Sequence, residues 1–279
     1  MYSVCTGGND HAGNSRYYSN TKKELTVMVV ALLTAAGIGS RMGQDIPKQF
    51  MHVENKPIII HTMEAFQNHP SVDAMVVVTL PAWIDVLKAY AAQFNITKLR
   101  WVVAGGTTGQ ESIYNGLMAV KAECTDDTII MVHDGNRCLV SSEIISNSLA
   151  TFKTHGSAVA AIPCVEAVFR SQDNGESSTI SIPREQLFRT QTPHTYTLGK
   201  LLWAHEEAKN KGIIGTAASC ALMQQLGETV YFSKGSEENL KITTVDDMMI
   251  FKALLHTKKD SWLKSVSYTH LTLPTICSV

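Results

Sequence analysis

The stretch Thr34–Phe50 combines small residues with cationic side chains at a spacing suited to phosphate binding. It follows the apolar run Thr26–Leu33, whose near-continuous aliphatic pattern predicts a strand buried on both faces. Small residues let the backbone turn tightly and leave amide groups open to a ligand. The small residues of this turn are Ala35, Ala36, Gly37 and Gly39. Because Arg41 and Lys48 add positive charge, we predict that the loop cradles a polyphosphate.

Two familiar phosphate-binding loops do not fit these residues. A P-loop needs Gly-Lys followed by Ser or Thr after four intervening residues, and that pattern does not occur here. A dinucleotide fingerprint needs a third glycine where Met42 stands. What remains is Gly-x-Gly-x-Arg-Met-Gly followed by Pro47-Lys48-Gln49, a more specific pattern than a bare glycine loop.

Asp134 is the candidate metal ligand, because it directly follows the predicted strand Thr128–Val132 and His133. Polyphosphate substrates arrive with Mg²⁺, which favours carboxylate oxygens and keeps much of its own water. The alternative is a carboxylate that caps a helix or closes a turn; the upstream glycine loop favours the metal. His133 fits a hydrogen-bonded structural residue better than a catalyst. Arg137 could pair with Asp134 or orient a turn, and its role stays open.

Predicted strands and helices alternate along the chain after the first loop. This order argues for an α/β fold with a mostly parallel sheet and helices on both faces. The further strands are expected at 74–80, 100–103, 128–132 and 157–162, and helices near 58–66, 83–94, 110–120 and after Ser141. Ligands of such sheets bind beyond the carboxyl ends of the strands. The Gly37 loop, the Gly105-Gly106 loop and Asp134 all fall there.

The rhythm changes at Val165–Thr192, which alternates polar and apolar residues around the turn signal Gln172–Gly175. We predict a projecting hairpin or arm. Helices then resume at Leu198–Lys209 and Thr216–Leu226, a short strand follows at 229–232, and the last helix begins near Thr244, its predicted cap.

The two ends of the chain stand apart from this pattern. Residues 1–25 are rich in Gly, Asn and Ser and are expected to be a disordered extension, with Met28 as an alternative start. Residues 26–257 are expected to form a single domain. The segment 265–279 fits no element and is expected to be a non-native tail.

The bulk composition excludes several classes of protein. The chain has 279 residues with 24 basic and 25 acidic side chains, so no global positive field favours nucleic acid or a membrane surface. No apolar run is long enough to span a membrane. The six cysteines are scattered without a C-x-x-C pair, which fits reduced thiols and a cytoplasmic protein.

Five motifs, in order over about residues 27–257, resemble the 2-C-methyl-D-erythritol 4-phosphate cytidylyltransferase family and its sister group, the ribitol-5-phosphate cytidylyltransferases. The motifs are the first glycine loop through PKQ, VVAGGTTGQESIYNGL, VHDGNRCLVS, IPREQLFRTQTP and SEENLKITTVDDM. The resemblance implies a Rossmann-like sheet of the nucleotide-diphospho-sugar transferase type, with a β-arm that clasps a second subunit. Val165–Thr192 would be that arm, and the protein a homodimer.

The resemblance also implies a reaction, in which a polyol phosphate attacks the α-phosphorus of CTP and pyrophosphate leaves. Arg41, Lys48 and Lys241 would hold the triphosphate, with Asp134 on Mg²⁺. Arg184 and Thr192 would hold the phosphate of the acceptor. The nucleotide would contact the two glycine loops at Ala35, Ala36, Gly37, Gly39, Gly106, Thr107 and Ser112.

Several residues depart from the pattern of the methylerythritol enzymes. They are Thr107, Gly109, Asn136, Cys138, Ala167 and Ala217. Those around the second glycine loop and the acceptor bear on acceptor identity rather than on nucleotidyl transfer. Methylerythritol phosphate is preferred narrowly over ribitol 5-phosphate. The alternatives are a CTP-binding module without turnover and a structural α/β domain with a chance glycine loop.

Overall fold

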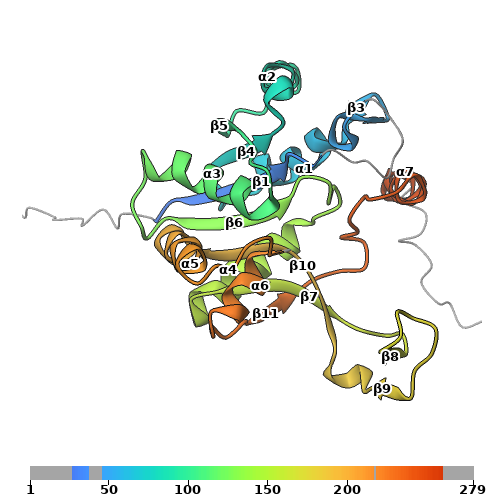
Figure 1. Ribbon diagram of the computed structural model, residues 1–279. Helices are drawn as coiled ribbons and strands as arrows, with labels where there is room; N and C mark the ends of the chain where they lie inside the picture. The colour runs from blue at the N-terminus through green and yellow to red at the C-terminus, as the bar shows by residue number, and fades with distance from the viewer. Residues whose placement is uncertain (1–26, 38–45, 217, 260–279) are drawn as a thin grey trace, which may run out of the picture.

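A computed structural model describes residues 27–37, 46–216 and 218–259, built around one seven-stranded sheet (Figure 1). Its strand order is β11-β7-β10-β6-β1-β4-β5. The strands are β1 (Val29–Ala35), β4 (Ala74–Thr79), β5 (Leu99–Ala104), β6 (Ile129–Asp134), β7 (Ala158–Pro163), β10 (Phe188–Thr197) and β11 (Phe232–Lys234). The neighbouring pairs are parallel except that β10 runs antiparallel to both β6 and β7. The predicted mostly parallel sheet is confirmed.

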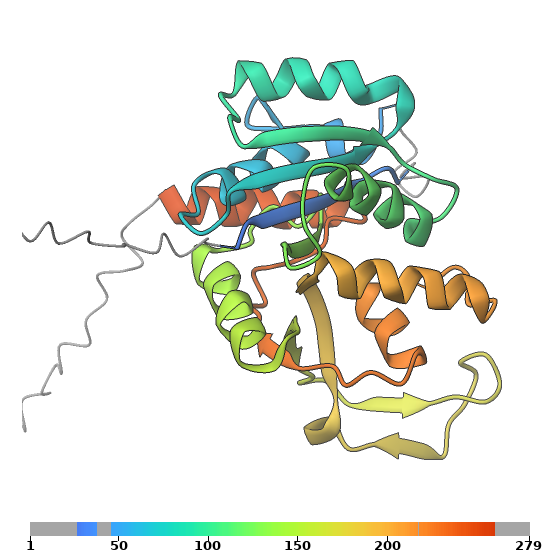
Figure 2. The same ribbon diagram turned by 90° about the vertical axis from the view of Figure 1, so that its left-hand side faces the viewer.

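Helices cover both faces of the sheet (Figures 1 and 2). They are α1 (Ile58–Gln67), α2 (Ile84–Gln93), α3 (Gly109–Lys121), α4 (Ser142–His155), α5 (Leu198–Asn210), α6 (Ser219–Gln225) and α7 (Val245–Lys259). Alternate residues of β1 point into two separate cores: Leu33 packs with α1, α2 and α4, whereas Leu32 packs with α3, α5 and α6. Burial on both faces explains why this strand reads as one aliphatic run.

Helix starts follow the expected capping chemistry. Thr108 accepts a hydrogen bond from the Glu111 amide at the start of α3, and Ser141 accepts one from Ile144 at the start of α4. At α7 the Thr244 hydroxyl accepts from the Asp247 amide, and the Asp247 carboxylate accepts from the Thr244 amide. This reciprocal pair is a capping box. Helix α7 then buries Phe251 against a small third core that includes Ile58 and Ile242.

The predicted arm is shorter than expected. A two-stranded hairpin of β8 (Val168–Arg170) and β9 (Ile180–Ile182) projects from the body, followed by the 3-10 turn η4 (Arg184–Gln186) (Figures 1 and 2). The last residues of the predicted arm instead open β10, a central strand that the sequence pattern did not reveal. Its register with β7 shifts between Thr190 and His194, and this irregularity accommodates Pro193, which cannot donate to a ladder.

The remaining elements are short. They are β2 (His52–Val53), β3 (Lys56–Pro57), η2 (Lys48–Phe50) and η3 (Pro81–Trp83). Among the helices of residues 27–37, 46–216 and 218–259, none combines the length and apolar character needed to cross a membrane. Two of the expected segments lie outside the residues that the structure describes: the extension 1–25 and the tail 265–279.

Candidate active site

A cavity of about 700 Å³ opens at the carboxyl edge of the parallel strands. Its lining brings together residues from the ends of β1, β5 and β6, from β10 and from the segment before α7. Most of the predicted site residues line it: Ala35, Ala36, Gly37, Lys48, Gly106, Thr107, Ser112, Asp134, Thr192 and Lys241. Gly39 and Arg41 lie outside the described residues. Lys48 and Lys241, far apart in sequence, therefore face one common space.

Gln49 holds the start of the first glycine loop through two hydrogen bonds. Its side chain is 2% exposed, and its Nε2 donates to the carbonyl oxygens of Ala35 and, at 3.2 Å, Gly37. These carbonyls therefore turn toward Gln49, which lies in the 3-10 turn η2 directly after Lys48. The sequence pattern included Gln49 only as part of the Pro-Lys-Gln motif. Its role as an anchor emerges from the backbone contacts.

The second glycine loop packs directly against the first. A Cβ atom placed on Gly105 would overlap the Cβ of Ala36, so only glycine allows this approach. Within the loop, the Gly106 amide donates to Ser112 Oγ at 3.0 Å, and that hydroxyl donates to the Thr108 carbonyl at 2.9 Å. Ser112 is thus part of the loop's own framework as well as of the cavity wall.

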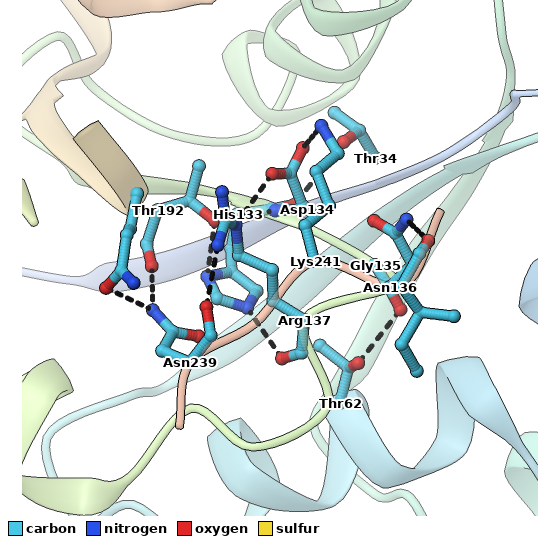
Figure 3. A network of polar contacts seen from close by, with 12 residues as sticks. Thr34, Thr62, His133, Asp134, Gly135, Asn136, Arg137, Thr192, Asn239 and Lys241 are labelled. Carbon is cyan, nitrogen blue, oxygen red and sulfur yellow. Dashed lines mark hydrogen bonds and ion pairs between the residues drawn. The ribbon is translucent and has the colours of Figure 1, made fainter. Parts of the chain in front are cut away.

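Asp134 lines the cavity and lies between two cationic side chains (Figure 3). Lys241 Nζ is 3.1 Å from Oδ1, and Arg137 Nε is 3.0 Å from Oδ2. Burial alone raises the pKa of the Asp134 carboxyl, but the charges of Lys241 and Arg137 outweigh that effect and lower it to about 2. Asp134 is therefore an anion that orients both cations throughout the neutral range.

The segment that carries Lys241 is fastened at several points to the loop after β6 (Figure 3). Arg137 Nη1 donates to the Asn239 carbonyl at 2.6 Å. Asn136 donates through its side chain to the Ile242 carbonyl, and the Ile242 amide donates to the Asn136 carbonyl at 3.0 Å. Asn136, a departure from the related motif, thus has a structural role that its position alone did not signal.

Thr192 and His133 form a hydrogen-bonded chain that ends at the backbone amide of Asp134 (Figure 3). Thr192 Oγ1 accepts from the Asp134 amide at 3.0 Å and lies 3.0 Å from His133 Nδ1. His133 Nε2 lies 3.2 Å from the Arg137 carbonyl, which can only accept, so Nε2 carries the proton. Because burial lowers the pKa of His133 to about 4, the ring is neutral and Nδ1 accepts from Thr192. The expectation that His133 is a structural residue agrees with these contacts.

The described residues contain no group of three or more His, Cys, Asp and Glu side chains arranged to hold a metal ion. Among the described residues that line the cavity, Asp134 carries the one carboxylate, and each of its oxygens contacts a cation. A metal ion on a remaining lone pair of this carboxylate would lie close to the Lys241 and Arg137 cations, which would repel it. The side chains present therefore do not fit a preformed metal site.

Arg184 lies apart from the cavity of its own chain. It begins η4 on the arm, where its Nη1 donates to the Val165 carbonyl at 3.2 Å and its Nε lies 3.5 Å from Glu185 Oε1. The other predicted acceptor residue, Thr192, does line the cavity. The structure thus separates two residues that the motif pattern grouped together.

Comparisons with known proteins agree with this geometry. A family model described as 2-C-methyl-D-erythritol 4-phosphate cytidylyltransferase matches residues 29–257. A ribitol-5-phosphate cytidylyltransferase of Lacticaseibacillus paracasei is 39% identical over 234 residues, which span 83% of this chain and 100% of the relative. A 2-C-methyl-D-erythritol 4-phosphate cytidylyltransferase of Geotalea uraniireducens is 37% identical over 228 residues, 81% of this chain and 96% of that protein.

Solved structures of cytidylyltransferases also match most of this chain. The crystal structure of a Francisella tularensis 2-C-methyl-D-erythritol 4-phosphate cytidylyltransferase superposes with a TM-score of 0.67 at 26% identity, covering 81% of this chain and 99% of that one. That of the Thermus thermophilus enzyme gives a TM-score of 0.65 at 25% identity, covering 82% of this chain and 100% of the other.

Proposed function

The chain belongs to the 2-C-methyl-D-erythritol 4-phosphate cytidylyltransferase family, and we propose that it joins CMP from CTP to ribitol 5-phosphate with release of pyrophosphate. The nucleotidyltransferase activity is that of its named relatives. The observation that carries the proposal is the shared cavity, where Lys48, Lys241 and the first glycine loop meet. Two lysines suit a triphosphate better than a neutral ligand.

Similarity to the relatives favours ribitol 5-phosphate over methylerythritol phosphate as the acceptor, the reverse of the narrow preference drawn from the motifs. Ribitol-5-phosphate cytidylyltransferases from several bacteria are 37–39% identical to this chain. The methylerythritol enzymes are 34–37% identical. The Gly-Gly-Thr of the second loop also resembles the ribitol group. Methylerythritol phosphate, which would place the enzyme in isoprenoid precursor synthesis, stays the second candidate.

The reaction is a direct displacement at phosphorus. An oxygen of the acceptor phosphate forms a bond to the α-phosphorus of CTP, and the bond from that phosphorus to the bridging oxygen of pyrophosphate breaks. A phosphate dianion is already a nucleophile at neutral pH, so no base is needed. Catalysis is then positioning and neutralisation of charge. Lys48, Lys241 and Arg41 would supply the positive charge, with Lys241 held in place by Asp134.

Magnesium enters this proposal with the nucleotide. Mg²⁺ bound to triphosphate oxygens would neutralise part of their charge, and it commonly retains several waters. Because both oxygens of Asp134 already contact cations, we assign that carboxylate to Lys241 and Arg137 rather than to the metal.

The arm supports a homodimer. Its exposed apolar side chains include Val165, Phe169 and Ile180, which a second copy would cover. Arg184 lies on the same arm and outside its own cavity, so it would reach an acceptor phosphate only in the cavity of the partner subunit. We place this enzyme in the cytoplasm, where CTP is made and used.

A direct assay tests the proposal. Purified protein is incubated with CTP, Mg²⁺ and either acceptor, and pyrophosphate release is followed. We expect release with ribitol 5-phosphate at a higher kcat/KM than with methylerythritol phosphate. Tight CTP binding without release with either acceptor would support a binding module that has lost turnover. If CTP also fails to raise the melting temperature, a structural domain is favoured instead.

A further inference from the structure

Two buried polar atoms of the cavity lining have no hydrogen-bond partner, His194 Nδ1 and Ser219 Oγ. Each residue is 3% exposed. Elsewhere in the part of the chain that the structure describes, the other buried side-chain atoms without a partner belong to residues outside this cavity. They are Tyr196 Oη, His205 Nε2, Ser233 Oγ and Asn239 Oδ1.

An unpaired buried polar group destabilises a folded protein, so one that borders a binding cavity points to a ligand atom as its partner. His194 is a neutral imidazole because burial lowers its pKa to about 4. A neutral imidazole and a serine hydroxyl can both pair with an alcohol. Neither is suited to hold a phosphate dianion in the way that Lys48 or Lys241 is.

The position of these atoms favours the acceptor rather than the nucleotide base. His194 lies on β10, opposite Val132 of β6, and Ser219 begins α6, which packs with β10 through the core around Tyr196. The second glycine loop follows β5, four strands away in the sheet order. At the usual spacing between strands, His194 on β10 lies roughly 19 Å from that loop. Ser219 precedes Cys220, whose thiol contacts Thr190 of β10, although the segment before α6 also reaches Gln110 at the start of α3 through Thr216.

We propose that His194 Nδ1 and Ser219 Oγ bind hydroxyl groups of the acceptor polyol and thereby set its specificity, an inference that rests on the proposed function. Ribitol 5-phosphate carries four free hydroxyls. Methylerythritol phosphate carries three and a methyl branch, which can pair with neither atom. A site built to hydrogen-bond hydroxyls discriminates strongly against an analogue that lacks one, because its own polar groups then stay unpaired.

Ser219→Ala tests the inference. Its matched control is Ser233→Ala, which removes a buried, unpaired serine hydroxyl that lies outside the cavity. We expect Ser219→Ala to raise KM for ribitol 5-phosphate about 10-fold and to lower its preference over methylerythritol phosphate similarly, with KM for CTP unchanged. Neither variant should lower the melting temperature, because each loses an unpaired group. Ser233→Ala should leave both KM values unchanged.

The histidines give a second matched pair, since His205 is also buried and unpaired but does not line the cavity. His194→Phe should weaken acceptor binding, whereas His205→Phe should not. If the wild-type protein is active and neither Ser219→Ala nor His194→Phe changes its KM for the acceptor, this inference alone is overturned. A lower melting temperature of Ser219→Ala with equal losses for both acceptors would also overturn it. A wild-type protein that transfers CMP to neither acceptor would overturn the proposed function and this inference together.

Discussion

Lys241 Nζ lies 3.1 Å from Asp134 Oδ1, although 107 residues separate the two in sequence. The contact places a lysine from the segment before α7 at the end of β6, beside the first glycine loop. Because Arg137 holds the second oxygen of Asp134, the carboxylate fixes two cations at once. The pair therefore links the end of the domain to the centre of the sheet.

Asp134→Asn should lower kcat/KM by about 100-fold, because Lys241 and Arg137 lose the charge that orients them. If the metal enters with CTP, as proposed above, the Mg²⁺ concentration giving half-maximal activity should stay within about twofold. A metal-ligand role would instead shift that concentration by roughly 10-fold or more. Asp126→Asn, at an exposed ion pair with Lys121, is the matched control and should leave activity unchanged.

Gln49→Glu should raise the Kd for CTP by about 10-fold or more. A carboxylate of nearly the same shape cannot donate to the Ala35 and Gly37 carbonyls, and its charge is repelled by them. Isothermal titration with CTP measures the effect. Gln67→Glu, at a surface contact with Thr97, is the control. Equal CTP affinity in the wild type and Gln49→Glu would remove Gln49 from the loop's support.

Gly105→Ala should separate the two glycine loops, because its Cβ would clash with that of Ala36. We expect weaker CTP binding together with a lower melting temperature. Gly199→Ala creates a comparable clash, with Asp126, at the start of α5 and away from the cavity. It should lower the melting temperature without changing KM for CTP. Loss of CTP binding in both variants would show that the effect is general destabilisation.

Acid should destabilise the fold through three buried histidines. Burial lowers the pKa of His133, His194 and His205 to about 4, from 6.5 for an exposed histidine. Well above pH 6.5 all three histidines are neutral in both the folded and the unfolded chain, so they do not change the free energy of unfolding. As the pH falls from 6.5 toward 4, only the unfolded chain binds these protons, so stability falls by up to roughly 3 kcal/mol per histidine.

Urea unfolding at a series of pH values measures this slope. His205→Phe should flatten it between pH 6.5 and 4 without changing catalysis, since His205 lies outside the cavity. A pH-independent free energy of unfolding over this window would contradict the burial of neutral imidazoles.

The sheet was predictable where strands are buried on both faces. In β1, β4 and β6 continuous aliphatic runs follow from two-sided burial, and the glycine loops after β1 and β5 carry their own signature. Strand β10 was not predictable in this way. Its first residues continue the polar alternation of the predicted arm, and Pro193 argues against a central strand. The register shift beside β7 accommodates the proline.

The site was predictable in its motifs and not in its contacts. Lys48 and Lys241 came from motif resemblance, and both line one cavity of the folded chain. Of the partners of Asp134, the nearby Arg137 was one of two roles that the sequence left open for that arginine, whereas the distant Lys241 could not be read from the chain. The roles of Asn136, Gln49 and Ser219 depend on backbone groups or cavities that only the folded chain brings near them.

The most direct test of the account is a double-mutant cycle on Lys48 and Lys241 with CTP and ribitol 5-phosphate. We predict that Lys48→Gln and Lys241→Gln each lower kcat/KM by on the order of 100- to 1,000-fold. We also predict that the double variant loses clearly less than the product of the two effects, because both lysines act on one triphosphate. Full additivity, or a single variant with wild-type kcat/KM, would contradict it.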